Sequence, residues 1–139
     1  MSATLIDRIE IRKDGVYLST HSTDDVGSYK TWQSEELSEA YKRDGQKGLD
    51  REMFRIFYEY AELGDFHKST ARYHRISDLP EAKALHRECF DQIDAFEKSC
   101  QSPSKFRAYD REMREKLYDK LAEKCGEYDR KQKNKDYER

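Results

Sequence analysis

The chain has few of the residues that interrupt or cross-link a fold: two Pro, six Gly and three Cys among 139 residues. So little proline and glycine favours helices. Three cysteines, an odd number with no close pair, fit a reducing compartment better than a disulfide-rich secreted domain. No stretch approaches the roughly 18 apolar residues of a membrane span. Because the start, Met-Ser-Ala-Thr-Leu-Ile-Asp, also lacks the apolar core of a signal peptide, we expect a cytoplasmic protein with no membrane partner.

Hydrophobicity is low as well, since apolar residues make up 35% of the chain and charged residues 40%. Low hydrophobicity indicates disorder when net charge is high, but here the formal net charge is only −2. Aromatic residues, 12% of the chain, each bring a large apolar area to a core. We therefore expect a single folded domain over residues 1–128 with a thin core. Residues 129–139 are expected to form a polar tail that frays.

A β-hairpin is predicted near the start of the chain, because Asp14-Gly15 lies between two runs of β-branched and aromatic residues. With these two residues as the loop, Ile11 lies opposite Leu18. One face of the hairpin is then apolar, as a sheet covered on one side requires, and consists of Ile9, Ile11, Val16 and Leu18. Residues 28–32 are expected to add a third antiparallel strand, and Trp32 is assigned to the core.

Helical periodicity dominates the rest of the chain. Ser34 is the expected N-cap of a short helix that ends at Gly45 and Gly48, and a second helix is predicted over residues 49–63. Residues 65–77 lack a clean period and are predicted to form an ordered loop, with an extended piece over 72–76.

Two further helices are predicted towards the C-terminus. A capping box, Asp78-x-x-Glu81, opens the first of them, and Ser102-Pro103 caps the last. The short connection between the two predicts antiparallel packing. The fold class is therefore α+β: an N-terminal β-hairpin or three-stranded antiparallel sheet followed by a bundle of about four helices.

The tetrapeptide Asp-Arg-Glu-Met occurs twice, at residues 50–53 and 110–113. The similarity between the two regions is not sustained beyond scattered positions, as a true repeat would require. Asp and Glu suit the start of a helix, and Met supplies the core. We interpret the repeat as shared helix chemistry rather than a duplicated pair of helices.

Few residues are spaced for metal or cofactor chemistry. His86 and Cys89 share a helix face, but zinc needs three or four ligands, and no Cys-x-x-Cys or His-Glu-x-x-His motif occurs. There is also no Gly-x-Ser-x-Gly, no P-loop and no Gly-x-Gly-x-x-Gly sequence. We expect no metal, no cofactor and no catalytic residue.

One hypothesis for the function is an enzyme whose active site is assembled from residues far apart in the sequence. It would centre on His21, Asp24 and Asp25, which fall in one segment, or on His74. The simpler interpretation of the first group is a set of turn residues that link strands.

The most basic window of the sequence is 66–77, which contains no acidic residue. Its basic side chains could contact phosphates while an aromatic ring stacks on a base. The candidate binding residues are Lys68, Arg72, Tyr73, His74 and Arg75. An ordinary solvated loop and a docking site for an acidic protein are the other interpretations, and a dedicated nucleic-acid domain is usually more basic.

Two segments, KDGVYLSTHSTDDVGSYKTW (13–32) and GLDREMFRIFYEYAEL (48–63), resemble stretches of small, functionally unassigned proteins carried by mobile elements of Gram-positive bacteria. The resemblance covers roughly a third of the chain. It implies a bacterial accessory role and supplies no catalytic residue.

The leading hypothesis is therefore a non-enzymatic protein–protein interaction or accessory module. Its partner would be another protein or a second copy of the chain, and the long amphipathic helices would offer the binding face. The alternative is a nucleic-acid-binding accessory protein that uses residues 67–75.

Overall fold

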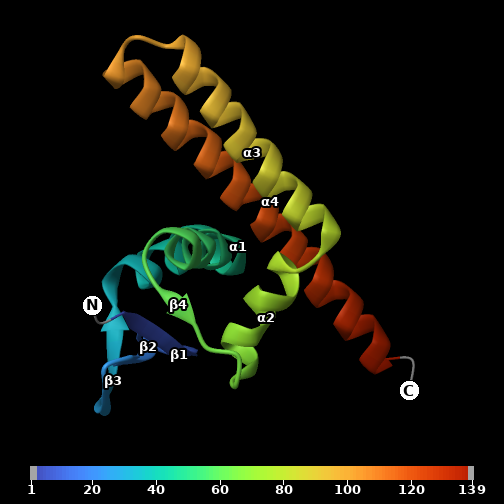
Figure 1. Cartoon of the computed structure of the whole chain (residues 1–139). Coiled ribbons are helices and arrows are strands. Elements are labelled where there is room, and N and C mark those ends of the chain that lie inside the picture. The colour runs from blue at the N-terminus through green and yellow to red at the C-terminus, as the bar shows by residue number, and fades with distance from the viewer. Residues whose placement is uncertain (1–2, 138–139) are drawn as a thin grey trace.

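The computed structural model describes residues 3–137, except for the side chains of residues 25, 26, 136 and 137. Within this range the chain forms four strands and four helices (Figure 1). The strands are β1 (Thr4–Arg12), β2 (Gly15–Ser22), β3 (Asp25–Ser34) and β4 (Glu62–Leu63). The helices are α1 (Glu35–Glu59), α2 (Lys68–Ser77), α3 (Pro80–Ser99) and α4 (Pro103–Tyr137). The predicted α+β class, three N-terminal antiparallel strands followed by helices, is confirmed.

The sheet has the strand order β3-β2-β1-β4. Strands β1, β2 and β3 are antiparallel neighbours, whereas β4 adds to β1 in parallel. The predicted hairpin is present, but its pairing differs from the expected register by two residues, because the loop is Lys13-Asp14 and Ile11 lies opposite Val16. This pairing also sets Ile9 against Leu18, so apolar side chains meet across the strands and stabilise the ladder.

One face of the sheet is covered by helices. Helix α1 packs over β2 and, to a lesser extent, β3, while α2 packs over β1. The prediction that Trp32 belongs to the core is wrong, since 41% of its surface is exposed. The reason is its place on the edge strand β3, where α1 gives little cover; its indole Nε1 donates to Thr20 Oγ1 at 3.1 Å.

Helix α1 turns sharply at Gly45, where φ is +69° and ψ is −151°. The predicted N-cap is confirmed, because Ser34 Oγ accepts from the Leu37 N–H. The predicted break at Gly45 is confirmed too, but Gly48 lies inside the second half of the helix rather than at an end. A Cβ atom on Gly48 would lie 2.6 Å from the Ala40 carbonyl oxygen, so this glycine permits the two halves of α1 to pack closely.

The second half of α1 ends four residues before the predicted end at Leu63, with Tyr60 as its C-cap. Residues 62 and 63 leave the helix and pair with β1 instead. Leu63 is buried in the core. The end of α1 is therefore set by sheet pairing and burial, which cannot be inferred from helical periodicity.

The prediction of a loop over residues 65–77 is wrong, because residues 68–77 form helix α2. Its buried face consists of Thr70, Tyr73 and Ile76, a spacing of three with a polar first member. In ten residues this pattern is too short and too polar to give a clear helical period. Packing against β1 and α4 supplies the stabilisation that the sequence alone does not.

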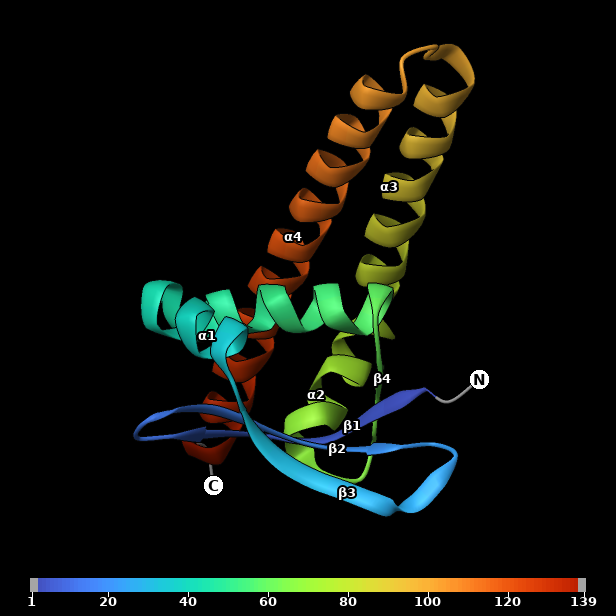
Figure 2. The same cartoon turned by 90° about the vertical axis from the view of Figure 1, so that its left-hand side faces the viewer.

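Helices α3 and α4 pack antiparallel, as predicted, and project well beyond α1 and the sheet (Figure 2). The predicted capping box at Asp78 is wrong: Asp78 is the C-cap of α2, and Leu79 is the N-cap of α3 without a side-chain bond. Helix α4 has 35 residues and is therefore about 52 Å long. It continues past residue 128, so the expected boundary between domain and tail falls within a helix.

No helix in the part of the chain described by the structure is both long and apolar enough to span a bilayer. The core instead joins three layers: the inner face of the sheet, then α1 with α2, then α4 with α3. Its largest fully buried side chains include Tyr73, Tyr118 and Phe54. Tyrosine thus provides much of the thin core.

The partly buried Tyr58 predicts how stability depends on alkaline pH. Burial, with the negative charge of Asp78, raises the pKa of Tyr58 to about 12, above the ordinary value of about 10. The folded state therefore holds this proton more tightly, and the stability it contributes is complete below pH 10 and is lost as pH rises from about 10 to 12. Tyr58→Phe should flatten the fall of the unfolding free energy across this window. Urea titrations of the wild type and Tyr58→Phe at several pH values measure this difference. Near pH 7 the Tyr58 hydroxyl is protonated in the folded and the unfolded state. There the unfolding free energy of the two proteins should change with pH at the same rate.

Candidate functional site

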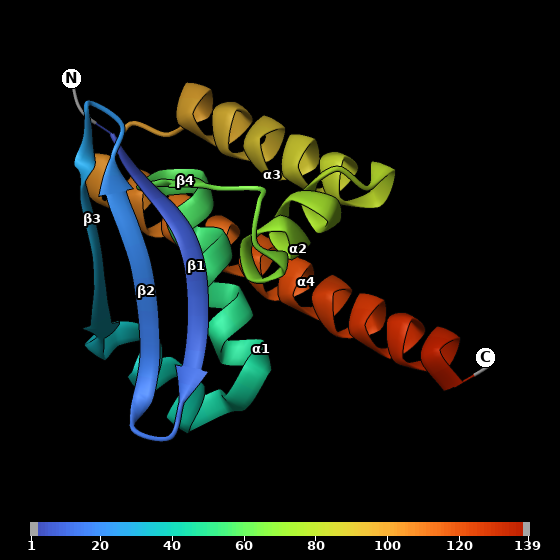
Figure 3. The same ribbon diagram turned by 90° about the horizontal axis from the view of Figure 1, so that it is seen from below.

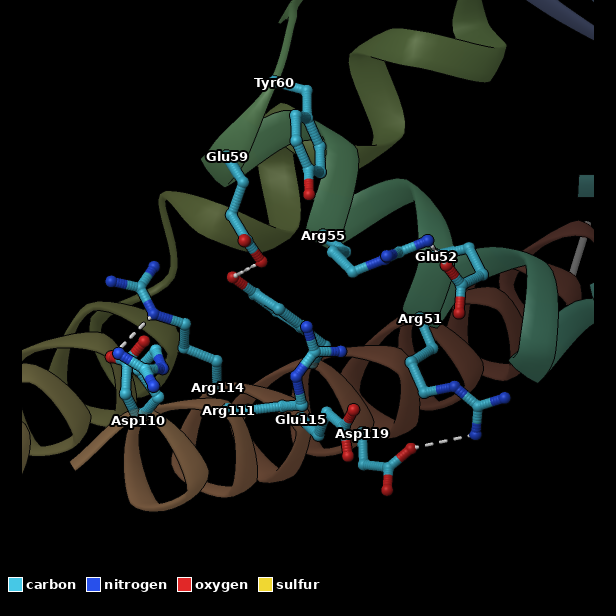
Figure 4. Close-up of a pocket in the computed structure, with 12 residues that line it drawn as sticks. Arg51, Glu52, Arg55, Glu59, Tyr60, Asp110, Arg111, Arg114, Glu115 and Asp119 are labelled. Atoms are coloured by element: carbon cyan, nitrogen blue, oxygen red, sulfur yellow. Dashed lines mark hydrogen bonds and ion pairs between the residues drawn. The ribbon is translucent and has the colours of Figure 1, made fainter. Parts of the chain in front are cut away.

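A groove of about 540 Å³ lies between the second half of α1 and the projecting half of α4 (Figure 4). From α1 and its C-cap it is lined by Arg51, Glu52, Arg55, Glu59 and Tyr60. From α4 it is lined by Arg107, Asp110, Arg111, Arg114, Glu115, Tyr118 and Asp119. We name it the arginine groove, because five arginines contribute to its walls.

Ion pairs hold three of the five arginines. Arg51 Nη1 lies 3.2 Å from Asp119 Oδ1 and so links α1 to α4. Arg114 Nε donates to Asp110 Oδ1 at 2.9 Å along α4. Figure 4 shows both contacts at the two ends of the groove. These ion pairs neutralise Arg51 and Arg114, whose side chains form part of the groove walls.

Arg55, the third of these arginines, contacts Glu36 and Glu52 through Nη2. Its Nε is buried and has no hydrogen-bond partner. A buried donor without a partner costs about 1–3 kcal/mol. The α1 wall of the groove therefore retains one unused hydrogen-bond donor.

The floor of the groove is formed by Tyr118, which is only 1% exposed. Its hydroxyl donates to Glu59 Oε2 at 2.7 Å, a bond drawn in Figure 4. Burial, followed by this bond, raises the pKa of the Tyr118 hydroxyl. The residue thus stays neutral at physiological pH and joins the C-terminal end of α1 to α4.

The two remaining arginines, Arg107 and Arg111, form no ion pair with any described residue of the chain. Both are exposed and lie one helical turn apart on α4. Figure 4 shows Arg111 reaching towards the middle of the groove. Tyr60, 70% exposed, faces the same space from α1 (Figure 4). The groove therefore offers two arginines without ion-pair partners beside an exposed aromatic ring, features that can contact an anionic group. Its five arginines are matched by five acidic lining residues, of which Glu59 and Glu115 also form no ion pair with a described residue.

Both copies of the Asp-Arg-Glu-Met tetrapeptide border this groove. Arg51 and Glu52 line it from the first copy, and Asp110 and Arg111 from the second. The two segments are 60 residues apart in sequence and lie on facing helices. Sequence reasoning missed the site, and the repeat was the one signal that could have pointed to it.

The candidate nucleic-acid-binding residues of segment 67–75 differ in how accessible their side chains are. Tyr73 is 1% exposed, and its hydroxyl donates to Asp50 Oδ1 at 2.7 Å, so its ring is not available to stack on a base. His74 places Nε2 2.8 Å from the Leu63 carbonyl oxygen, and its ring packs edge-on against Phe57. Only Lys68 and Arg75 of the five are exposed, and Arg75 donates to the Tyr128 hydroxyl at 3.0 Å.

Arg72, the remaining candidate, joins three helices in a partly buried charge network. Its Nη1 and Nη2 each donate to one oxygen of Asp50 on α1, both at 2.8 Å. Its Nε and Nη2 donate to the two oxygens of Asp129 on α4, at 2.8 and 2.6 Å. Burial alone would lower the pKa of the guanidinium, but the hydrogen bonds to Asp50 and Asp129 outweigh it and raise the pKa. Carboxylates of the protein therefore bind both hydrogen-bonding edges of the Arg72 guanidinium, and the residue has a structural role.

The enzyme hypothesis has two alternative centres, the segment of His21, Asp24 and Asp25, and His74. His21 lies in β2, where its Nδ1–H donates to Asp7 Oδ2 at 2.7 Å and its ring stacks on Tyr29. His74 is in α2, bound as described above. The Asp24 backbone N–H donates to Ser22 Oγ at 3.4 Å in the turn after β2, and the side chain of Asp25 lies outside the described residues.

His86 and Cys89 both lie on α3, and the ring of His86 packs against Tyr58 and Phe90. Burial lowers the pKa of His86 and raises that of the Cys89 thiol. Within residues 3–137, no three His, Cys, Asp or Glu side chains are placed to hold a metal ion together. The ring contacts of His86 and the 5% exposure of Cys89 place both side chains in the packing of α3.

Comparisons of the chain with protein-family models, with curated proteins and with solved structures found no match.

Proposed function

We propose that the protein is a non-enzymatic interaction module that binds a carboxylate-rich segment of a partner protein in the arginine groove. The observation that carries the proposal is the pair Arg107 and Arg111, two guanidinium groups without acidic partners beside a groove whose other charges are mostly paired. Arginine matches carboxylates in a planar, two-bond geometry. An accessory role in a bacterial cell is the setting that the sequence resemblance implies.

The spacing of the arginines favours an extended acidic segment. On α4, Arg107 and Arg111 are four residues apart, which is a rise of about 6 Å. Alternate side chains of an extended peptide point to the same side and are about 7 Å apart. Acidic residues at alternate positions of a strand-like segment can therefore pair with both arginines at once.

Other groups in the groove set the specificity of binding. The exposed ring of Tyr60 offers an apolar surface to a neighbouring side chain of the ligand. The carboxylate of Glu115 lines the same groove and would repel a ligand whose acidic groups lie out of register. Binding of this kind is electrostatic at a solvent-exposed surface, so it weakens with added salt.

The test is a titration of a fluorescently labelled peptide of alternating Glu and Ser, followed by fluorescence anisotropy at low salt. Wild-type protein should bind the peptide. Arg107→Ala/Arg111→Ala should weaken binding several-fold, up to about thirtyfold, since each lost ion pair at an exposed surface contributes about 0.2–1 kcal/mol. Both residues are exposed, so the variant should keep the wild-type circular dichroism spectrum.

Lys131→Ala/Lys133→Ala is the matched control, because it removes the same charge from the same helix, outside the groove. It should leave peptide affinity within about twofold. Equal losses in both variants would mean that only bulk charge attracts the peptide, and no binding by the wild type would end the proposal.

Single-stranded DNA in the same assay tests the nucleic-acid alternative. That alternative now depends on Lys68 and Arg75, the two exposed cations of segment 67–75. Binding of DNA that Lys68→Ala/Arg75→Ala abolishes and Arg107→Ala/Arg111→Ala leaves intact would favour it over the acidic segment.

A further inference from the structure

The two edges of the sheet differ in whether other segments bind their backbone groups. At the β1 edge, β4 pairs with Leu5 and Ile6. Further along β1, the Ile9 N–H donates to Ser69 Oγ at 2.9 Å. The other edge is β3, whose only neighbour in the sheet is β2. Figure 3 shows that no element lies along the outer side of β3.

The open edge offers unpaired backbone groups over residues 29–33. Arg12 and Gly15 flank the two-residue hairpin loop and therefore form a hydrogen-bonded pair between β1 and β2. The N–H of the next residue, Val16, then points away from β1. Its hydrogen bond to Ser38 Oγ agrees with this direction. Leu18 and Thr20 therefore point towards β3 and bond to their partners Trp32 and Lys30. By alternation along the regularly paired residues 30–34, the N–H and C=O groups that face outwards belong to Thr31 and Gln33, and Tyr29 follows at the start of the irregular stretch.

This edge is only partly protected against strand pairing. Natural edge strands are kept short or carry charges, a proline or a bulge. In β3, which has ten residues, the pairing with β2 is irregular between Asp25 and Lys30, but residues 30–34 pair regularly and contain Lys30 as their one charged residue and no proline. All five side chains from 29 to 33 are exposed. Tyr29, at 61% exposure, and Trp32 are two of the large exposed apolar side chains of the described chain.

We infer that β3 pairs with β3 of a second copy of this chain, antiparallel and about a two-fold axis at Thr31. Thr31 then exchanges both backbone hydrogen bonds with its own counterpart, and Tyr29 does so with Gln33 of the second copy. The two four-stranded sheets become one continuous sheet. A two-fold contact of this kind closes on itself, so it produces a dimer and not a fibre.

The complementarity of residues 29–33 selects this register. With the axis at Thr31, the ammonium group of Lys30 lies opposite the indole of Trp32 of the second copy, a favourable cation–aromatic pair. An axis at Lys30 would oppose two ammonium groups directly. An axis at Trp32 or Gln33 would bring the pairing into residue 35, where α1 begins. Thr31 is thus the centre that pairs residues 29–33 without reaching α1.

Sedimentation velocity from micromolar to near-millimolar concentrations tests the inference. The wild type should shift to a dimer as concentration rises. Thr31→Pro removes the central outward N–H but none of the bonds between β3 and β2, and proline is tolerated on an edge strand in this orientation. Thr31→Lys keeps the backbone intact and opposes two like charges at the axis. Both variants should remain monomeric at concentrations where the wild type is dimeric.

Thr31→Ser is the matched control and should dimerise like the wild type, because it keeps the backbone N–H, the small size and the hydroxyl. If Thr31→Pro fails to fold, Thr31→Lys decides, since the Thr31 side chain is exposed on the uncovered face. A wild type that stays monomeric throughout, or a dimer that persists in Thr31→Lys, would overturn the inference. Neither result bears on the arginine groove, which lies on other elements.

Discussion

Arg72→Ala is expected to lower the free energy of unfolding by about 3–5 kcal/mol, because it breaks a buried ion pair by removal of one partner. Asp50 is 1% exposed, and Arg72 makes two of the hydrogen bonds that its carboxylate accepts. After the substitution the carboxylate keeps only the Tyr73 hydroxyl at 2.7 Å and Gln46 Nε2 at 3.0 Å. The same change also releases Asp129 and so loosens α4 from α2. Urea denaturation followed by circular dichroism measures the loss.

Arg75→Ala is the matched control for this prediction. It removes the same side chain from the same helix, three residues away, where the guanidinium is exposed and donates only to the Tyr128 hydroxyl. The expected loss is below about 1 kcal/mol. Equal losses in the two variants would show that the buried network does not stabilise the fold. It also follows that nucleic-acid tests should leave Arg72 in place, because its removal would confuse unfolding with lost binding.

Gly48→Ala is expected to destabilise the protein by about 1–3 kcal/mol, as overpacking in a tightly packed core does. The new Cβ would lie 2.6 Å from the Ala40 carbonyl oxygen and 2.7 Å from Asp44 Cβ. Both neighbours are held by the turn at Gly45, so the two halves of α1 would have to move apart. Alanine in a helix normally stabilises by up to about 1 kcal/mol relative to glycine, and the clash outweighs this gain.

Gly126→Ala is the control, because it makes the same change in an open part of α4. There a Cβ would approach only Arg130 Nη1, at 3.5 Å. This variant should be more stable than the wild type by up to about 1 kcal/mol. Opposite signs for the two glycines would confirm that close packing of the α1 halves requires Gly48. A stabilised Gly48→Ala would refute it. Thermal or urea unfolding of both variants supplies the comparison.

Elements with strong local signals were predictable. Ser34 is followed by acidic residues and is the N-cap of α1, and Gly45 breaks that helix as a glycine with positive φ can. The long apolar stripes of α3 and α4 repeat at helical spacing over several turns, so their antiparallel packing followed from the short connection between them. Helix α2 and strand β4 gave no such signal, because ten mostly polar residues and a two-residue strand are stabilised by what they pack against.

The candidate site was harder to predict than the fold. The basic composition of segment 67–75 is evident from the sequence, but composition does not show whether a cation faces solvent or an internal carboxylate. Asp50 and Asp129, which bind Arg72, are 22 residues before it and 57 after it. The arginine groove likewise joins side chains of α1 and α4 that no local pattern connects.

Local sequence signals are sufficient to predict the α+β class, the hairpin, the first helix cap and the two long C-terminal helices, because propensity, capping and periodicity act within a few residues of the chain. Contacts between distant segments set the strand register, the exposure of Trp32, the helical state of residues 68–77 and the partners of Arg72. Each of these depends on pairing or burial between segments far apart in sequence, where the free energy belongs to the contact and not to either segment alone.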